Sequence, residues 1–156
     1  MPVELALYQP DIAQNTGTLL RLGACFGVTV HIIHPTGFPF SRRELKRGGL
    51  DYLEFAQFVE HDSYAHFDSV RHAAGQRLVL LSTKASESAY AVRYDDNDVL
   101  MMGRETAGVP ADVAAGADLR VRIPMLPERR SLNVAVAASL VLGEALRQTL
   151  RFEALT

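Results

Sequence analysis

The sequence contains one cysteine and no tryptophan in 156 residues, and it carries no run of about 18 apolar residues. One cysteine excludes an intramolecular disulfide, and the missing apolar run argues against a membrane-spanning helix. The chain does not open with a basic segment followed by an apolar one, so we expect no signal peptide and a cytoplasmic location. The composition, 48% hydrophobic and 22% charged, is typical of one globular domain, predicted to span residues 1–156.

Several common catalytic motifs are also missing. No G-x-G-x-x-G follows the first expected strand, and neither a Gly-Lys-Ser/Thr loop nor a G-x-S-x-G is present. Dehydrogenases, kinases and hydrolases therefore have no sequence support. The five histidines lack the spacing of metal ligands, and we expect no metal site. Cys25, between Ala24 and Phe26, is predicted to be a small core residue of a buried helix rather than a nucleophile.

The net charge of −2 gives no overall nucleic-acid signature, so an anionic partner needs a local basic patch. Two such clusters stand in the sequence: Arg42, Arg43, Lys46 and Arg47, and then Arg120, Arg122, Arg129 and Arg130. The first lies on a short expected helix at i, i+4 spacing, which gives one basic face. Taken alone, that face is more typical of a solvated helix surface than of a nucleic-acid site.

Strands and helices are expected to alternate along the chain. Alternation of this kind predicts a parallel sheet with both faces covered by helices. We expect strands over 3–8, 28–33, 78–82, 99–102 and 119–123, and helices over 15–26, 41–48, 63–73, 111–115 and 131–150. Ligands of such sheets bind beyond the carboxyl ends of the strands, here 10–17, 81–84, 103–110 and 123–131.

Three of these carboxyl-end segments have unusual chemistry. "NTGTLLR" (15–21) places Arg21 in an otherwise apolar helix, although an arginine at a helix edge can simply keep its head in water. "MGRETAGVP" (102–110) has glycines that permit close approach of a ligand to the backbone, or that form a plain tight loop. "RIPMLPERRSLN" (122–133) contains Ser131, a good N-cap, but capping requires neither its arginines nor the small residues that follow.

Together these segments resemble the SPOUT class of knotted methyltransferases, and most closely its tRNA wobble (cytidine/uridine) 2′-O-methyltransferase family. The likeness spans nearly the whole chain, through "LYQPDIAQNTGTLLRL" (7–22), "RLVLLSTK" (77–84), "LMMGRETAGVP" (100–110) and "RIPMLPERRSLNVAVA" (122–137), with "RRELKRGGLDYLEF" (42–55) as a family-specific signature. The sequence departs from the family at Arg104 and Ala107, where the family often has Pro and Arg, and at Leu132, where Met is usual.

The resemblance implies a C-terminal deep trefoil knot that binds S-adenosylmethionine. The implied cofactor-binding residues are Leu81, Gly103, Ile123 and Ser131, with Met102, Met125 and Leu132 as apolar neighbours of the adenine. The small residues Ala135, Ala137, Ala138 and Gly143 would pack against threaded backbone.

The implied reaction is methylation of the ribose 2′-hydroxyl of the wobble nucleotide in the tRNA anticodon loop. Arg21 would orient or activate that hydroxyl, helped by Asn15 and by Ser131 or Asn133, while Glu105 would hold its loop or a partner subunit. A guanidinium has no lone pair to accept a proton, so stabilising the developing alkoxide is the sounder role for Arg21. RNA would contact Arg42, Arg43, Lys46, Arg47, Arg129 and Arg130, and the enzyme would act as a homodimer.

Three alternatives stay open at this point. A non-catalytic knotted RNA-binding protein would bind RNA but not the cofactor. A related 2′-O-methyltransferase could act on ribosomal RNA instead of tRNA. A small-molecule α/β enzyme would leave both basic clusters and the "NTG" segment unexplained.

Overall fold

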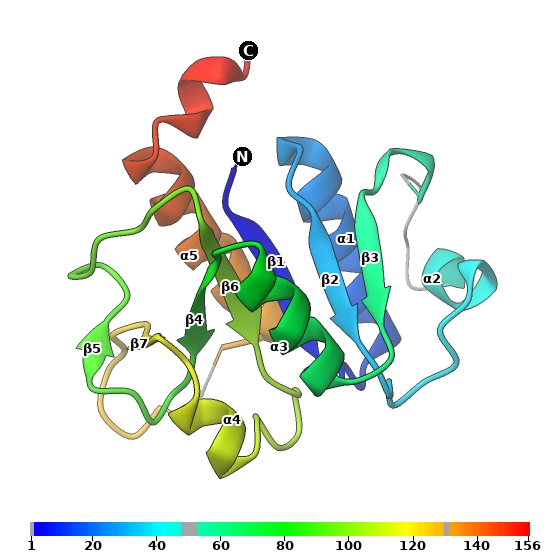
Figure 1. Ribbon diagram of the computed structural model, residues 1–156, viewed down its shortest axis with the longest axis horizontal. Coiled ribbons are helices and arrows are strands. Elements are labelled where there is room, and N and C mark those ends of the chain that lie inside the picture. The colour runs from blue at the N-terminus through cyan, green and yellow to red at the C-terminus, as the bar shows by residue number, and fades with distance from the viewer. Residues whose placement is uncertain (1, 48–52, 130–131) are drawn as a thin grey trace.

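The computed structural model describes residues 2–47, 53–129 and 132–156, with the side chains of Arg47 and Leu53 excepted. In this part of the chain a sheet has the strand order β3-β2-β1-β6-β4-β7-β5 (Figure 1). The strands are β1 Glu4–Tyr8, β2 Val30–Ile33, β3 Phe58–His61, β4 Arg77–Leu81, β5 Glu87–Ser88, β6 Asp98–Met102 and β7 Leu119–Arg122. All their pairings are parallel, as predicted.

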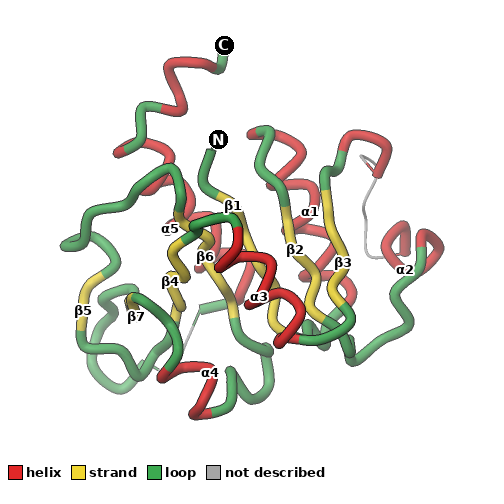
Figure 2. Tube along the Cα trace, in the orientation of Figure 1, coloured by secondary structure: helices red, strands yellow, loops and turns green. Residues whose placement is uncertain are grey.

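Helices cover both faces of the sheet, which Figure 2 shows in red around the yellow strands. The helices are α1 Ala13–Phe26, α2 Arg42–Arg47, α3 Tyr64–Ala73, α4 Ala111–Ala115 and α5 Val134–Gln148, with 3-10 turns η1 Leu53–Phe55 and η2 Arg151–Ala154. Helices α1 and α5 contribute to one buried apolar cluster, and α3 and α4 contribute to the other. None of the helices in the described ranges is long and apolar enough to cross a membrane.

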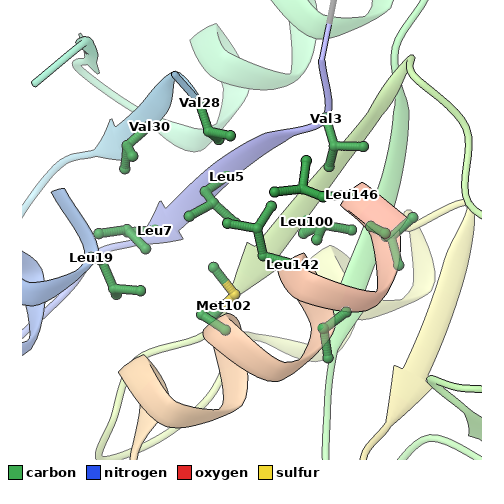
Figure 3. Close-up of a cluster of buried hydrophobic side chains, with 14 of the residues drawn as sticks. Val3, Leu5, Leu7, Leu19, Val28, Val30, Leu100, Met102, Leu142 and Leu146 are labelled. Carbon is green, nitrogen blue, oxygen red and sulfur yellow. The ribbon is translucent and has the colours of Figure 1, made fainter. Parts of the chain in front are cut away.

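The central strands β1 and β6 are buried along their whole length. Because side chains of a strand alternate between faces, Leu5 and Leu100 enter the α1/α5 cluster while Ala6 and Met101 enter the α3/α4 cluster. Figure 3 shows Leu142 of α5 packed among the first set. Burying a leucine of this kind contributes about 1.5–3 kcal/mol, so the two clusters hold the layers together.

Helix α1 ends where the sequence predicts. Gly27 adopts a left-handed conformation with φ of 66°, and its N–H donates to the carbonyl of Gly23. A side chain at Gly23 would meet the Val28 carbonyl oxygen at 2.7 Å, so glycine there lets α1 lie close to β2. The prediction for Cys25 is wrong, because its side chain is exposed: it lies on the outer face of α1, away from the sheet.

The last helix begins later than predicted. Asn133, not Ser131, is the N-cap of α5: its side-chain oxygen accepts hydrogen bonds from the N–H groups of Ala135 and Val136. Ser131 itself lies outside the described residues. Gly143 does not pack against threaded backbone as expected, because a Cβ there would have nothing within 4 Å. Ala138 is fully buried in the apolar cluster that α1 and α5 share.

The register of the parallel strands brings the carboxyl ends of the central strands to one level. Leu7 of β1 pairs with Met102 of β6, Met102 pairs with Leu81 of β4, and Leu81 pairs with Val121 of β7. The loops that follow these strands therefore start side by side. This edge of the sheet is where the candidate site lies.

Candidate active site

Two adjoining pockets open at the carboxyl ends of β4, β6 and β7. The smaller has a volume of about 240 Å³, and the wider cleft beside it about 1300 Å³. Both are lined by Leu81, Ser82, Thr83, Leu132 and Ala137. Because the two pockets share these residues, they form one concave surface, to which the segments that follow β4, β6 and β7 contribute.

Three of the four expected cofactor residues line this surface. Leu81 lines both pockets, Ile123 the smaller one and Gly103 the wider one. The expected apolar neighbours are there too: Met125 and Leu132 line the smaller pocket, and the buried Met102 lines the cleft. Ser131 lies outside the described residues, although Leu132, directly after it, lines both pockets.

The loop after β6 closes on itself. The N–H of Arg104 donates to the carbonyl of Gly108 over 3.1 Å, and the N–H of Gly108 donates back over 2.9 Å. A Cβ at Gly103 would lie 2.8 Å from the Cα of Gly108, and Gly108 itself has a φ of +63°. Loop closure is therefore sufficient to explain glycine at both positions.

Arg104, a departure from the family pattern, braces the same loop. Its Nε donates to the carbonyl of Gly108 over 3.1 Å, and its guanidinium lies 5.5 Å from the centre of the Tyr8 ring. This cation–π contact ties the loop to the end of β1.

Asp11 and Glu105 exchange hydrogen bonds beside the cleft. The N–H of Asp11 donates to Oε2 of Glu105 over 3.1 Å, and the N–H of Glu105 donates to Oδ1 of Asp11 over 3.2 Å. The hydroxyl of Thr106 donates to the other oxygen of Asp11. Burial, together with contact with Asp11, raises the pKa of Glu105 to about 7. The hydrogen bond from Glu105 in turn lowers the pKa of Asp11.

The two expected positioning asparagines also meet. The side-chain amide of Asn133 donates to Oδ1 of Asn15 over 3.1 Å, and both residues line the cleft. Arg21 is not brought to them: it is exposed and is not among the residues lining either pocket. Six residues further along α1, it lies roughly 9 Å along the helix axis from Asn15.

Basic side chains flank the concave surface. Lys84, Arg104 and Arg120 line the cleft, and Arg122 and Arg129 line the smaller pocket. Arg120 is partly engaged, since it donates to the carbonyls of Ala114 and Ala117 at the end of α4. Arg130 lies outside the described residues.

The other basic cluster forms helix α2. Leu45 is buried and anchors this helix, while Arg42, Arg43 and Lys46 are exposed. Arg47 ends the helix, with its side chain outside the description. Three of the four predicted cations are thus exposed on a helix that the buried Leu45 anchors.

Sequence analysis missed a chain of histidines on the α3 side of the sheet. Buried Glu4 bonds to Nε2 of His31, Nδ1 of His31 lies 2.9 Å from Nε2 of His61, and His61 reaches His66 over 3.1 Å. Only the parallel pairing of β1, β2 and β3 brings these positions together, which no local spacing reveals. Across the described residues, no group of three His, Cys, Asp or Glu side chains is arranged to hold a metal ion.

Residues 2–143 match the SpoU rRNA Methylase family, and the chain belongs to that family. It is 57% identical over 144 residues to the tRNA (cytidine(34)-2'-O)-methyltransferase of Beijerinckia indica subsp. indica, covering 92% of this chain and 90% of that protein. It is 43% identical over 148 residues to the enzyme of the same name from Escherichia coli (strain K12), covering 94% and 93%.

Solved structures agree with this assignment. One that concerns the 2-OH methylation of C/U34 on tRNA has a TM-score of 0.88 at 40% identity, covering 94% of this chain and 95% of that one. An AdoMet-bound rRNA methyltransferase from Sinorhizobium meliloti has a TM-score of 0.84 at 28% identity, covering 94% of this chain and 56% of that one. The parallel α/β fold and the family predicted from the sequence are thus those of SpoU methyltransferases.

Proposed function

We propose that this protein transfers a methyl group from S-adenosylmethionine to the ribose 2′-hydroxyl of nucleotide 34, the wobble nucleotide, in the anticodon loop of tRNA. One observation carries the proposal. In a chain closely similar over nearly its whole length to tRNA (cytidine(34)-2'-O)-methyltransferases, Leu81, Gly103 and Ile123 converge on one concave surface.

The smaller pocket fits the adenosyl part of the cofactor. Its walls are apolar at Leu81, Ile123, Met125 and Leu132, and the hydroxyl residues Ser82 and Thr83 stand beside them. An apolar slot with a few polar groups at its rim is typical of nucleoside sites. When bound, S-adenosylmethionine supplies a methyl group on a positively charged sulfur, which is a good leaving group.

The knot belongs to this proposal. In support of it, the chain leaves β7 through 123–129, lines the smaller pocket there, and returns at Leu132 to line the cleft opposite the 103–108 loop. Helix α5 then packs on the α1 side of the sheet, where Leu142 contacts the central cluster. A chain threaded between the 81–86 and 103–108 loops would follow this course.

The protein must orient the 2′-hydroxyl and stabilise negative charge on its oxygen. In this proposal Arg21 stabilises the developing alkoxide, since its guanidinium stays charged and offers several hydrogen-bond donors. Asn15 and Asn133, paired over the cleft, would hold the ribose or the facing backbone. The proton of the hydroxyl would pass to solvent or to a substrate phosphate rather than to Arg21.

A homodimer is part of the same proposal. Exposed apolar side chains stand at Val136 and Leu140 of α5, and at Leu132 just before the helix, which gives an apolar stripe at four-residue spacing. Gly143 continues the stripe with open space above it, as a closely approaching second helix requires. Since Arg21 does not line the cleft of its own chain, a second copy packed against α1 and α5 is the arrangement that would complete the site.

RNA would bind through the exposed cations. The residues that would contact phosphates of the anticodon stem-loop are Arg42, Arg43, Lys46 and Arg47 of α2, Arg129, which lines the smaller pocket, and Arg130, which follows it in the sequence. Binding through phosphates weakens steeply with salt, and we expect this dependence here.

The test is methylation of purified RNA in vitro. The protein is incubated with S-adenosylmethionine and either a tRNA pool or ribosomal RNA, and 2′-O-methylated nucleosides are quantified by mass spectrometry after digestion. We expect new 2′-O-methylcytidine or 2′-O-methyluridine at position 34 of tRNA. Methylation of ribosomal RNA alone would favour the second candidate, an rRNA 2′-O-methyltransferase, which the Sinorhizobium meliloti relative suggests. RNA binding without cofactor binding would leave the non-catalytic alternative.

A further inference from the structure

Asp11 and Glu105 bring two carboxyl groups close together beside the cleft, which Glu105 lines. Each accepts the backbone N–H of the other residue, so their side chains cross. Among the described residues, no Lys or Arg forms an ion pair with either carboxylate. Two ionised carboxylates this close repel each other, and such pairs keep together by sharing one proton.

Asp11 is also held from its other side. A Cβ at Gly37 would lie 2.6 Å from the Cβ of Asp11, and the N–H of Gly37 donates to the carbonyl of Pro10 over 2.9 Å. The 36–38 loop therefore leaves Asp11 little freedom to move away from Glu105. The position of the carboxyl pair is set by three segments: the start of α1, the 36–38 loop and the 103–108 loop.

The pair lies at a junction of the proposed site. Glu105 belongs to the closed loop that lines the cleft, and Asp11 immediately precedes the helix that carries Asn15 and Arg21. Asn15 in turn bonds to Asn133 at the start of α5. Movement at Asp11 would therefore shift one wall of the cleft against the others.

Resting on the proposed function, we propose that Asp11 is a positioning residue for methyl transfer: a proton shared with Glu105 holds the 103–108 loop against the start of α1 and keeps the cofactor site closed. The proton resides on Glu105, and Asp11 accepts it. Thr106 completes the clamp by donating its hydroxyl to Asp11.

This arrangement makes the clamp sensitive to pH. The groups that face it are the Thr106 hydroxyl and the two backbone N–H groups; the charged residues lining the same cleft are Lys84, Glu87, Arg104, Asp118 and Arg120. Burial, with Asp11 alongside, raises the pKa of Glu105 to about 7, so the shared proton is present below that pH and is lost above it. Loss of the proton puts two charges in contact and opens the loop.

The test measures S-adenosylmethionine binding by calorimetry at about pH 6 and about pH 8.5. The variant Glu105→Gln imitates a permanently protonated Glu105, because its amide donates where the shared proton stood. The variant Asp11→Ala removes the clamp. The matched control is Asp96→Asn, because Asp96 is an exposed carboxylate in the loop before β6, at the amino ends of the strands and away from the cleft.

We expect the dissociation constant of the wild type and of Asp96→Asn to rise about ten-fold between the two pH values, and that of Glu105→Gln to change less than about two-fold. Asp11→Ala is expected to bind at least about ten-fold more weakly than wild type at the lower pH. A Glu105→Gln variant that follows the wild-type pH dependence, or an Asp11→Ala variant that binds normally, overturns the proposal.

Thermal unfolding of each variant distinguishes a lost clamp from a lost fold. If Glu105→Gln does not fold, carbon-13 NMR of the wild-type glutamate carboxyls gives the same answer: a resonance titrating near pH 7 supports the shared proton, and its absence contradicts it. Wild type that binds cofactor and methylates tRNA upholds the proposed function whichever way these variants behave.

Discussion

The side-chain amide of Asn133 donates a hydrogen bond to the side chain of Asn15, 118 residues earlier, over 3.1 Å. Asn133 also caps α5 with its own side-chain oxygen. One residue thus starts the last helix and ties it to the first across the cleft. The two roles can be separated by substitution.

Asn133→Ala removes both roles, whereas Asn133→Ser keeps a capping oxygen but is too short to reach Asn15. We expect the alanine variant to lose about 1 kcal/mol of unfolding free energy and the serine variant less than about 0.5 kcal/mol. Both variants, and Asn15→Ala, should lose methylation to a similar extent, because all three lack the bridge. Denaturant unfolding and single-turnover methylation provide the measurements. Full activity in Asn133→Ser would show that the bridge is dispensable.

Gly103→Ala should damage the cofactor site through its backbone. The added Cβ would stand 2.8 Å and 2.9 Å from the Cα and carbonyl carbon of Gly108, and neither backbone atom can swing aside. We expect a loss of about 1–3 kcal/mol in stability and no measurable cofactor binding. Gly116→Ala is the control, since its Cβ would meet only ordinary contacts beyond 3.4 Å. Calorimetry that finds the two variants alike would contradict this account of the loop.

Val136→Asp should dissociate the proposed homodimer, because it buries a charge in the apolar stripe of α5. Val70→Asp on α3 is the matched control, with 43% of the residue exposed against 47% for Val136. Sedimentation velocity is expected to find wild type and Val70→Asp as dimers and Val136→Asp as a monomer with methylation at least about ten-fold lower. A wild type that sediments as a monomer, or a dimeric Val136→Asp, would refute the interface.

Arg21→Ala should slow methyl transfer by about 100-fold or more while leaving cofactor affinity unchanged, since we place its guanidinium against the developing alkoxide and not against the cofactor. Arg21→Lys keeps the charge but loses the planar fork, so an intermediate rate is expected. Arg93→Ala is the control for loss of surface charge, because Arg93 is exposed in the loop between β5 and β6. Equal rates in Arg21→Ala and Arg93→Ala would remove Arg21 from the mechanism.

His61 should make the protein less stable in mild acid. Burial, together with the charges of His31 and His66, lowers the pKa of His61 from 6.5 to about 4. Between those pH values the unfolded chain binds a proton at His61 that the folded chain does not, so stability falls as pH falls from about 6.5 to about 4. The unfolding free energy lost in this way is at most about 1.4 kcal/mol for each pH unit within that range.

The measurement is the unfolding free energy across this pH range for wild type, His61→Gln and His72→Gln. We expect the acid-side slope to flatten in His61→Gln and to persist in His72→Gln, whose imidazole is largely exposed. The same slope in all three proteins would show that His61 titrates normally in the folded state.

The parts of the fold that the sequence predicts are those set by local pattern. A buried β-branched or apolar run predicts β1 and β6, and Gly27 predicts the end of α1 because glycine readily takes the left-handed conformation. Edge strand β3 escapes prediction, since its Val59 and Glu60 are exposed and only pairing with β2 orders them. Two-residue β5 is likewise defined only by its neighbour β7.

The candidate site is predictable to the extent that family motifs mark its segments. Leu81, Gly103 and Ile123 stand at strand ends that a parallel sheet must gather, so their convergence follows from topology. The N-cap of α5 could not be settled in advance, because both Ser131 and Asn133 are suitable capping residues. The Asp11–Glu105 pair and the histidine chain could not be predicted, because their residues lie far apart in the sequence and meet only in the folded chain.

The central claim is that the protein methylates the 2′-hydroxyl of nucleotide 34 in tRNA, and one measurement tests it directly. Two synthetic anticodon stem-loops, or full tRNAs if the stem-loop does not bind, are compared: one all-ribose and one with a 2′-deoxynucleotide only at position 34. Methyl transfer from radiolabelled S-adenosylmethionine is followed for each. The account predicts stoichiometric labelling of the all-ribose RNA and none of the deoxy-substituted RNA. Equal labelling of both, or labelling of neither by a protein that binds the cofactor, would contradict it.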